Sequence, residues 1–150
     1  MEISHPSQKP LSALLAKIKK HIKRYEGFVS LVYDCPAGYA SVGYGRNLET
    51  KGITKKEAEY LLLNDIEDSL NFLSKKFSNF DNFPDFAKIA LIDMHFNLGS
   101  KGLSNFKKMC KAVKEENWEL ASQELLESKY ATQVKKRARM NASYFLACVE

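Results

Sequence analysis

The feature that most constrains this chain is a glycine-punctuated stretch from Arg24 to Asn47, RYEGFVSLVYDCPAGYASVGYGRN. Apolar residues before it recur at helical spacing, and Gly27 is a typical helix terminator. After Gly27, the alternation of Val29, Leu31 and Tyr33 predicts a strand. The stretch is therefore expected to place the end of a helix against a β-ribbon.

The turn of this ribbon is predicted at the CPAG sequence that begins with Cys35, because proline fixes one φ and glycine adopts a positive one. On the returning strand Gly43 and Gly45 have no side chains, so backbone or ligand can approach closely. Glu26 would lie at the edge of this surface as a candidate acid. The alternative is that Glu26 merely ends the helix, and the residues alone leave both interpretations open.

The spacing of these residues resembles the signature of the phage-type lysozymes, glycoside hydrolase family 24. That signature is Glu, eight residues, Asp or Cys, five residues and Thr, followed by an aliphatic-Gly-aromatic-Gly run. Here GFVSLVYD separates Glu26 from Cys35, and PAGYA separates Cys35 from Ser41, which VGYG follows. The chain departs from the signature in its less usual Cys and in Ser instead of Thr. Asp34 is one residue out of register, which in a strand points it to the other face.

The length of 150 residues, with 45% hydrophobic residues, predicts a single domain. The net charge of +5 favours an anionic partner, either nucleic acid, a membrane surface or an acidic cell-wall polymer. The basic residues are scattered and form no nucleic-acid recognition motif, so nucleic acid is not expected as a partner.

The three cysteines are odd in number and widely separated, so neither a disulfide framework nor a metal site is expected. The N-terminal sequence MEISHPSQKP has no hydrophobic secretory core, and no apolar run is long enough to span a bilayer. We therefore expect synthesis in the host cytoplasm without a signal peptide and no stable membrane insertion. If the substrate is the cell wall, as the resemblance implies, the protein is expected to reach it after release by a separate route.

Beyond the ribbon, periodicity and capping signals predict helices. The TKKE sequence from Thr54 is a capping box, and Asn117 caps a later helix. His95, Cys110 and Cys148 are interpreted as packing residues. Residues 1–10 are predicted as a loose extension, 77–83 as an ordered loop, and helices at 11–25, 54–76, 84–99, 103–113, 118–125 and 134–145.

The resemblance extends from about Leu15 to Phe145 and includes the weaker segments GITKKEAEYLLLNDI, FNLG and SKYATQVKKRA. It implies an α+β fold, mostly helical and two-lobed like a lysozyme, with a small β-ribbon beside the catalytic cleft. The small lobe would span about 27–60. The helical lobe would span about 77–150 and include the N-terminal helix. A monomer is expected.

The resemblance also implies roles for individual residues. Glu26 takes the general-acid position, while Cys35 and Ser41 take the positions that flank the attacking water or the anomeric carbon. Arg46 is expected to pair with Asp65. The remaining implied residues support the substrate or the acid: Phe96 and Asn97 on the cleft floor, Tyr130 near the glutamate, and Arg137 paired with it.

Such an enzyme cleaves the β-1,4 bond between N-acetylmuramic acid and N-acetylglucosamine in peptidoglycan, without a cofactor or metal. Glu26 must carry a proton to donate, and burial against Tyr25 or Phe28 would favour that neutral form. A thiol with an ordinary pKa of about 8.5 is mostly neutral at pH 7, so Cys35 is a weaker base than a carboxylate unless its surroundings lower that pKa. Whether it acts through water or as a nucleophile stays open.

The leading hypothesis is a peptidoglycan-cleaving lysozyme that acts in phage lysis or cell-wall lysis. One alternative is a catalytically silent descendant that only binds cell-wall glycan. Another is a membrane-active basic helix at residues 11–25, although a core-facing helix with a solvated lysine face is the commoner situation.

Overall fold

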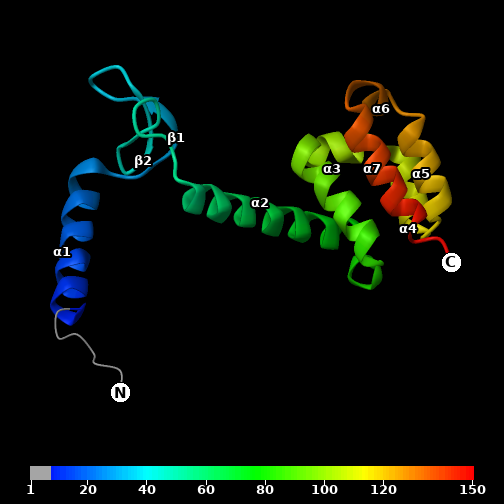
Figure 1. The fold of residues 1–150 in the computed structure, drawn as a ribbon, viewed down its shortest axis with the longest axis horizontal. Coiled ribbons are helices and arrows are strands. Elements are labelled where there is room, and N and C mark those ends of the chain that lie inside the picture. The colour runs from blue at the N-terminus through cyan, green and yellow to red at the C-terminus, as the bar shows by residue number, and fades with distance from the viewer. Residues whose placement is uncertain (1–7) are drawn as a thin grey trace. The chain divides into compact units, whose positions relative to one another are not determined.

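The computed structural model describes residues 8–150, and it describes side chains from Ser12 onward. The chain divides between Ala58 and Glu59 into two units, a small unit with a sheet and a larger helical unit (Figure 1). The mostly helical composition with a small antiparallel sheet confirms the α+β class. The small unit includes the first helix, α1. The assignment of that helix to the helical lobe stays a prediction.

Helix α1 spans Gln8–Glu26 and ends at Gly27, as predicted. Gly27 has a φ of 68° and its N–H donates to the carbonyl of Lys23 at 3.0 Å. The helix begins before Leu11, so residues 8–10 are not a loose extension. Pro10 is tolerated there because the first-turn N–H groups have no intrahelical acceptor. The rest of that predicted extension, residues 1–7, lies outside the described residues.

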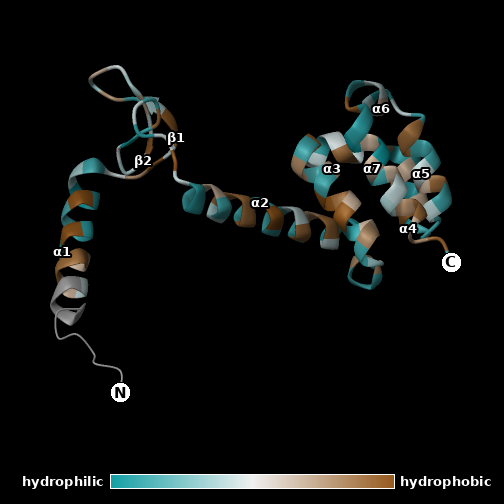
Figure 2. Ribbon diagram, in the orientation of Figure 1, coloured by the Kyte–Doolittle hydropathy of each residue, from teal (hydrophilic) through white to brown (hydrophobic). Residues whose placement is uncertain are grey.

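Hydrophobic and hydrophilic residues alternate along the coloured part of α1 (Figure 2), and most of the hydrophilic ones are basic. The large apolar side chains from Leu14 to Tyr25 are exposed, and Ser41 is the one buried residue among the described side chains of the small unit. Three short strands offer too little surface to build a core. The expected packing of α1 against a core is therefore not seen within this unit.

The sheet contains β1 (Val29–Asp34), β2 (Ala40–Gly43) and β3 (Arg46–Asn47), antiparallel in that order. The predicted CPAG turn joins β1 to β2, and Gly38 within it has a φ of 86°. The third strand was not predicted, because it is only two residues long. It forms because the chain turns back sharply at Tyr44 and Gly45, where Gly45 has a φ of 71°.

The alternation predicted for β1 is interrupted between Val29 and Tyr33, where the register to β2 shifts. Leu31 and Val32 are both exposed, so neither face of this strand is buried. A strand without a buried face has a weakly specified register, which explains the irregularity.

Helix α2 spans Lys55–Lys76 and begins at the predicted capping box. The Thr54 hydroxyl accepts from the N–H of Glu57 at 3.2 Å and donates to its carboxylate at 3.0 Å. Arg46 pairs with Glu57 at 3.0 Å, a partner that was not expected, and its predicted pair with Asp65 stays a prediction. Glu57 is in the first turn of α2, which residues 48–54 connect to β3. Asp65 is about 12 Å further along the helix axis.

Replacing Thr54 by Ala is expected to lower the free energy of unfolding by about 1 kcal/mol, because the N–H of Glu57 loses its acceptor. The thermal midpoint measures this loss. Specific activity should change little, since no residue assigned to the chemistry contacts Thr54. Thr50→Ala is a matched control outside the capping box, and an equal loss in both variants would mean that Thr54 is not the cap.

The larger unit begins within α2 and continues as a helical bundle. Gly99, with a φ of 72°, interrupts α3 at the predicted helix end, but a further helical turn follows it. The short α6 was not predicted as a separate helix; it begins after Ser128, whose hydroxyl accepts from the N–H of Ala131. The elements are η1 (Phe80–Asn82), α3 (Asp85–Ser104), α4 (Lys107–Lys114), α5 (Trp118–Leu126), α6 (Lys129–Gln133) and α7 (Lys135–Leu146).

The core of this unit is built from all of its longer helices and from the loop before α3. In that loop Phe83 packs edge-to-face on Trp118, with ring centroids 5.0 Å apart, and Trp118 stacks on Phe145. Cys110 and Cys148 are buried and free, which confirms them as packing residues. Within residues 8–150, no helix is both long and apolar enough to cross a membrane.

Candidate active site

Glu26 is the last residue of α1, and its carboxylate lies directly against Gly45 at the β2–β3 turn. A Cβ atom on Gly45 would be 2.6 Å from Oε2 of Glu26. Real Cβ atoms do not approach an oxygen so closely, so the carboxylate can occupy this position only because residue 45 is glycine. The end of the helix and the turn of the ribbon therefore meet at the candidate acid, as the sequence predicted.

The turn that carries Gly45 is held by Tyr44. The ring of Tyr44 lies 5.6 Å from that of Phe28, and Nζ of Lys23 lies 5.1 Å above the Tyr44 ring. Both partners flank Glu26 in the sequence, one turn before it and two residues after it. These contacts fix the position of the turn relative to the carboxylate.

The sequence predicted that aromatic neighbours bury Glu26, but the structure shows an exposed residue within its unit. Tyr25 is 74% exposed and Phe28 is 68% exposed. Phe28 turns to Tyr44 instead, and the neighbouring ring of Tyr25 lies 4.9 Å from that of His21, one turn back on α1. The prediction that Tyr25 and Phe28 bury Glu26 is therefore wrong within the small unit.

Cys35 and Ser41 lie together on the ribbon. Cys35 begins the turn, with its N–H donating to the Tyr39 carbonyl at 2.9 Å, and Ser41 is buried opposite Tyr33. Hydrogen bonds to the sulfur hold the pKa of the Cys35 thiol below its usual value, the largest from the backbone of Tyr39 and a smaller one from the Ser41 side chain. The turn therefore raises the fraction of Cys35 that is present as the thiolate, the form that reacts as a nucleophile or accepts a proton.

In the helical unit, Tyr130 and Asn97 form a second pair of predicted site residues. The hydroxyl of the buried Tyr130 donates to Oδ1 of Asn97 at 3.0 Å, and the Tyr130 ring packs edge-to-face on Phe106. Burial raises the pKa of Tyr130, so its hydroxyl stays a donor. The bond occupies Oδ1 of the exposed Asn97 side chain and leaves its Nδ2 to donate to a ligand.

Arg137 on α7 pairs with Asp93 on α3. Nε and Nη2 of Arg137 donate to the two carboxylate oxygens at 2.9 and 2.7 Å, and Asn141 donates to Oδ2 at 2.8 Å. The hydrogen bonds from Arg137 hold the pKa of Asp93 below its usual range. The structure thus gives Arg137 a carboxylate partner that was not expected. Its pairing with Glu26 stays a prediction.

Phe96 and His95 are neighbours on α3 with different surroundings. Phe96 is exposed, as a residue that contacts a ligand would be. His95 stacks on Phe72 at 4.6 Å and is hydrogen-bonded to Ser69 at 2.7 Å and to Ser100 at 2.9 Å, which confirms its packing role. Burial lowers the pKa of His95, so the ring that joins α2 to the kinked end of α3 is neutral near pH 7.

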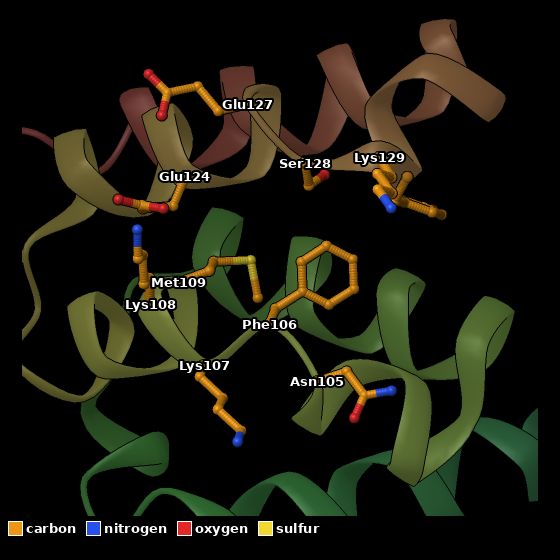
Figure 3. A pocket seen from close by; sticks show the side chains of 10 residues that line it. Asn105, Phe106, Lys107, Lys108, Met109, Glu124, Glu127, Ser128 and Lys129 are labelled. Atoms are coloured by element: carbon orange, nitrogen blue, oxygen red, sulfur yellow. The ribbon is translucent and has the colours of Figure 1, made fainter.

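A hollow of about 750 Å³ opens beside Tyr130, between α4 and the segment of α5 and α6 (Figure 3). Figure 3 shows the Phe106 ring and the Met109 sulfur in its middle, while Lys108 and Glu124 point toward one another at its edge. An apolar floor with a charged rim suits a ligand with both kinds of surface. The lining residues are Asn105, Phe106, Lys107, Lys108, Met109, Glu124, Glu127, Ser128, Lys129 and Tyr130.

We find no candidate metal site in the part of the chain that the structure describes. Its His, Cys, Asp and Glu side chains form no group of three that could hold a metal ion.

Asp93 and Asn141 are the two polar residues that the sequence pattern did not single out. The sequence spacing could have identified both residues. Asp93 lies one helical turn before Asn97, and Asn141 lies one helical turn after Arg137. Residues four apart on a helix share a face, so each lies beside a predicted site residue.

Comparison with known proteins gives two matches. A sequence model described as phage lysozyme matches residues 23–141, most of the chain, including the ribbon and all seven predicted site residues. The "Probable T4-type lysozyme 2" of Dictyostelium discoideum is 34% identical over 97 residues, which are 65% of this chain. The match covers 54% of that relative, so this chain spans about half the length of the curated protein it resembles.

Proposed function

Because the chain belongs to the phage lysozyme family, we propose that it hydrolyses the β-1,4 bond between N-acetylmuramic acid and N-acetylglucosamine in peptidoglycan. One observation carries the proposal most: the Glu26 carboxylate is seated against Gly45 on the ribbon that also holds Cys35 and Ser41. All four residues lie inside the region that matches the family.

In this reaction Glu26 donates a proton to the leaving oxygen, and its exposure lets a glycosidic bond reach it. Cys35 and Ser41 act on the other side of the sugar ring, where an oxocarbenium-like centre needs support or a water needs orientation. The lowered pKa of Cys35 supports its assignment as the base or nucleophile of this step.

Four residues of the helical unit are proposed to bind the glycan or support the acid. Asn97 offers Nδ2 to a sugar oxygen while Tyr130 holds its Oδ1. Phe96 offers an exposed ring to the apolar face of a sugar. Arg137 takes the place of the arginine that pairs with the catalytic glutamate in the family. We further propose that the protein acts in phage lysis or cell-wall lysis, reaching the wall by a separate release route.

The test is digestion of purified peptidoglycan, followed by borohydride reduction of the new sugar ends. A muramidase produces reduced N-acetylmuramic acid, whereas cleavage of the other glycosidic bond produces reduced N-acetylglucosamine and would contradict the proposal. Binding of glycan without new reducing ends would favour the silent descendant. Lysis of cells without new reducing ends would favour the membrane-active helix.

Cys35→Ala is expected to slow cleavage by about tenfold or more, less than a complete loss because Ser41 still orients water. Cys35→Asp should keep substantial activity, because a carboxylate is ionised at neutral pH. Both rates are measured on purified peptidoglycan. An alanine variant as active as the wild type would show that Cys35 only fills space.

Alkylation gives an independent check of the same residue. Because the thiolate is the reacting form, the rate of Cys35 modification by iodoacetamide should rise at a lower pH than for an ordinary thiol of pKa about 8.5. Mass spectrometry locates the label, and the buried Cys110 and Cys148 serve as internal controls. A saturating glycan should slow labelling at Cys35. Loss of activity without a label on Cys35 would contradict its assignment.

A further inference from the structure

Gly99 interrupts α3 just after Phe96 and Asn97, the two residues of this helix that are proposed to contact the glycan. Its φ of 72° and ψ of 177° are not helical, so the backbone hydrogen bonds of α3 do not run continuously through this point. The orientation of the residues on either side of the kink therefore depends on side-chain contacts as well.

The imidazole of His95 makes such contacts. Nε2 is hydrogen-bonded to the hydroxyl of Ser100, beyond the kink, at 2.9 Å, and Nδ1 to the hydroxyl of the buried Ser69 on α2 at 2.7 Å. The ring also stacks on Phe72 of α2, with ring centroids 4.6 Å apart and planes inclined by 20°. One side chain thus joins the helical part of α3, the segment after Gly99 and α2.

These contacts suit a neutral imidazole. A neutral ring has one N–H donor and one acceptor nitrogen, and each serine hydroxyl can take either role, so both hydrogen bonds form. A protonated ring has two donors and carries a charge next to the buried Ser69. Burial accordingly lowers the pKa of His95, and the charge of Asp68 opposes this shift more weakly.

The charged groups around the ring come from α2 and from the segment after the kink. Asp65 and Asp68 on α2 line an open hollow of about 340 Å³ together with His95, and Lys101 is exposed next to Ser100. A protonated ring would be attracted toward the two carboxylates and the solvent in this hollow, while Lys101 adds positive charge beside Ser100. Both effects favour movement of a charged ring away from Ser100.

We propose that His95 is a positioning residue for Phe96 and Asn97: its neutral ring ties the segment after Gly99 to α2, and protonation of the ring releases this tie. The inference rests on the proposed function, which gives Phe96 and Asn97 their contact with the glycan. The folded state lowers the pKa of His95, so the tie stabilises the fold above the ordinary histidine pKa of about 6.5. This stabilisation is lost as the pH falls from that value through the lower pKa of the folded state.

The first test removes the tie without changing His95. In Ser100→Ala the backbone amides of residues 96–103 should exchange with deuterium about fivefold faster than in the wild type at about pH 7.5, because one ordinary hydrogen bond is lost. In the wild type the same amides should approach the rates of the variant at about pH 5, after correction for the intrinsic pH dependence of exchange. The corrected rates of the variant should change little between the two pH values.

The second test is the activity of the same variant on purified peptidoglycan. In Ser100→Ala the KM should rise about fivefold at about pH 7.5 with kcat nearly unchanged, because displaced Phe96 and Asn97 side chains weaken binding of the substrate and the transition state alike. The KM of the wild type should rise toward that of the variant as the pH falls to about 5. Ser100→Thr keeps the hydroxyl and should restore the wild-type KM.

Ser104→Ala is the matched control. It removes a serine of the same segment whose hydrogen bond to α2, from Nζ of Lys76 at 3.3 Å, does not involve His95. It should leave the KM and its pH dependence unchanged.

Equal exchange rates in Ser100→Ala and the wild type would overturn the inference alone. A lower thermal midpoint of Ser100→Ala with an unchanged KM would also overturn it, because the contact would then be merely structural. A wild type that cleaves no glycan would overturn the proposed function and the positioning role with it, whereas the exchange rates would still show whether the tie at Ser100 responds to pH.

Discussion

Replacing Glu26 by Gln is expected to lower the rate of glycan cleavage by about 10²–10⁴-fold. Glutamine has nearly the same size and can occupy the same place beside Gly45, but its amide cannot deliver a proton to the leaving oxygen. The loss should appear in kcat, because the interaction exists only as the bond breaks. Release of reducing ends from purified peptidoglycan measures it.

The fold should survive this substitution, because Glu26 is exposed and ends its helix. An unchanged thermal midpoint and unchanged glycan binding would show this. Glu49→Gln is a suitable control, since it removes another exposed carboxylate from the same unit, one that accepts from the N–H of Ala40 on β2. A folded Glu26→Gln protein with most of the wild-type rate would refute the catalytic assignment.

Replacing Gly45 by Ala is expected to reduce the rate of cleavage by roughly 100-fold. The substitution changes no charge, so the expected effect is steric. Its Cβ atom would lie 2.6 Å from Oε2 of Glu26 and 3.0 Å from the carboxyl carbon, so the carboxylate must move by most of an ångström. A displacement of about 1 Å at a reacting group costs on the order of 100-fold in rate. The same peptidoglycan assay measures the effect.

The positive φ of Gly45 adds backbone strain of about 1–2 kcal/mol for any other residue. Gly52→Ala separates strain from displacement, because Gly52 has a φ of 59° and the nearest atom to its Cβ position is 3.9 Å away. That control should lose stability without losing specific activity. Equal activity losses in the two variants would show that strain, and not the position of Glu26, limits the enzyme.

Local signals in the sequence determined the elements of this protein. Gly27 ends α1, CPAG turns the ribbon, Thr54 starts α2 and Asn117 starts α5, where its side chain accepts from the N–H of Leu120 at 3.1 Å. Each of these features depends on partners within about four residues. Local hydrogen bonds of this kind depend on residues close in sequence and not on tertiary contacts, so sequence spacing is enough to predict them.

The partners of the charged site residues were decided only by tertiary structure. Arg137 meets Asp93 across 44 residues because α3 and α7 pack together. Arg46 on β3 pairs with Glu57 because the link of residues 48–54 brings the first turn of α2 beside β3. The resemblance implied which residues do the chemistry, but it named neither of the two carboxylate partners that the structure shows. A long side chain can reach several groups, and packing geometry alone selects which carboxylate lies within hydrogen-bond distance.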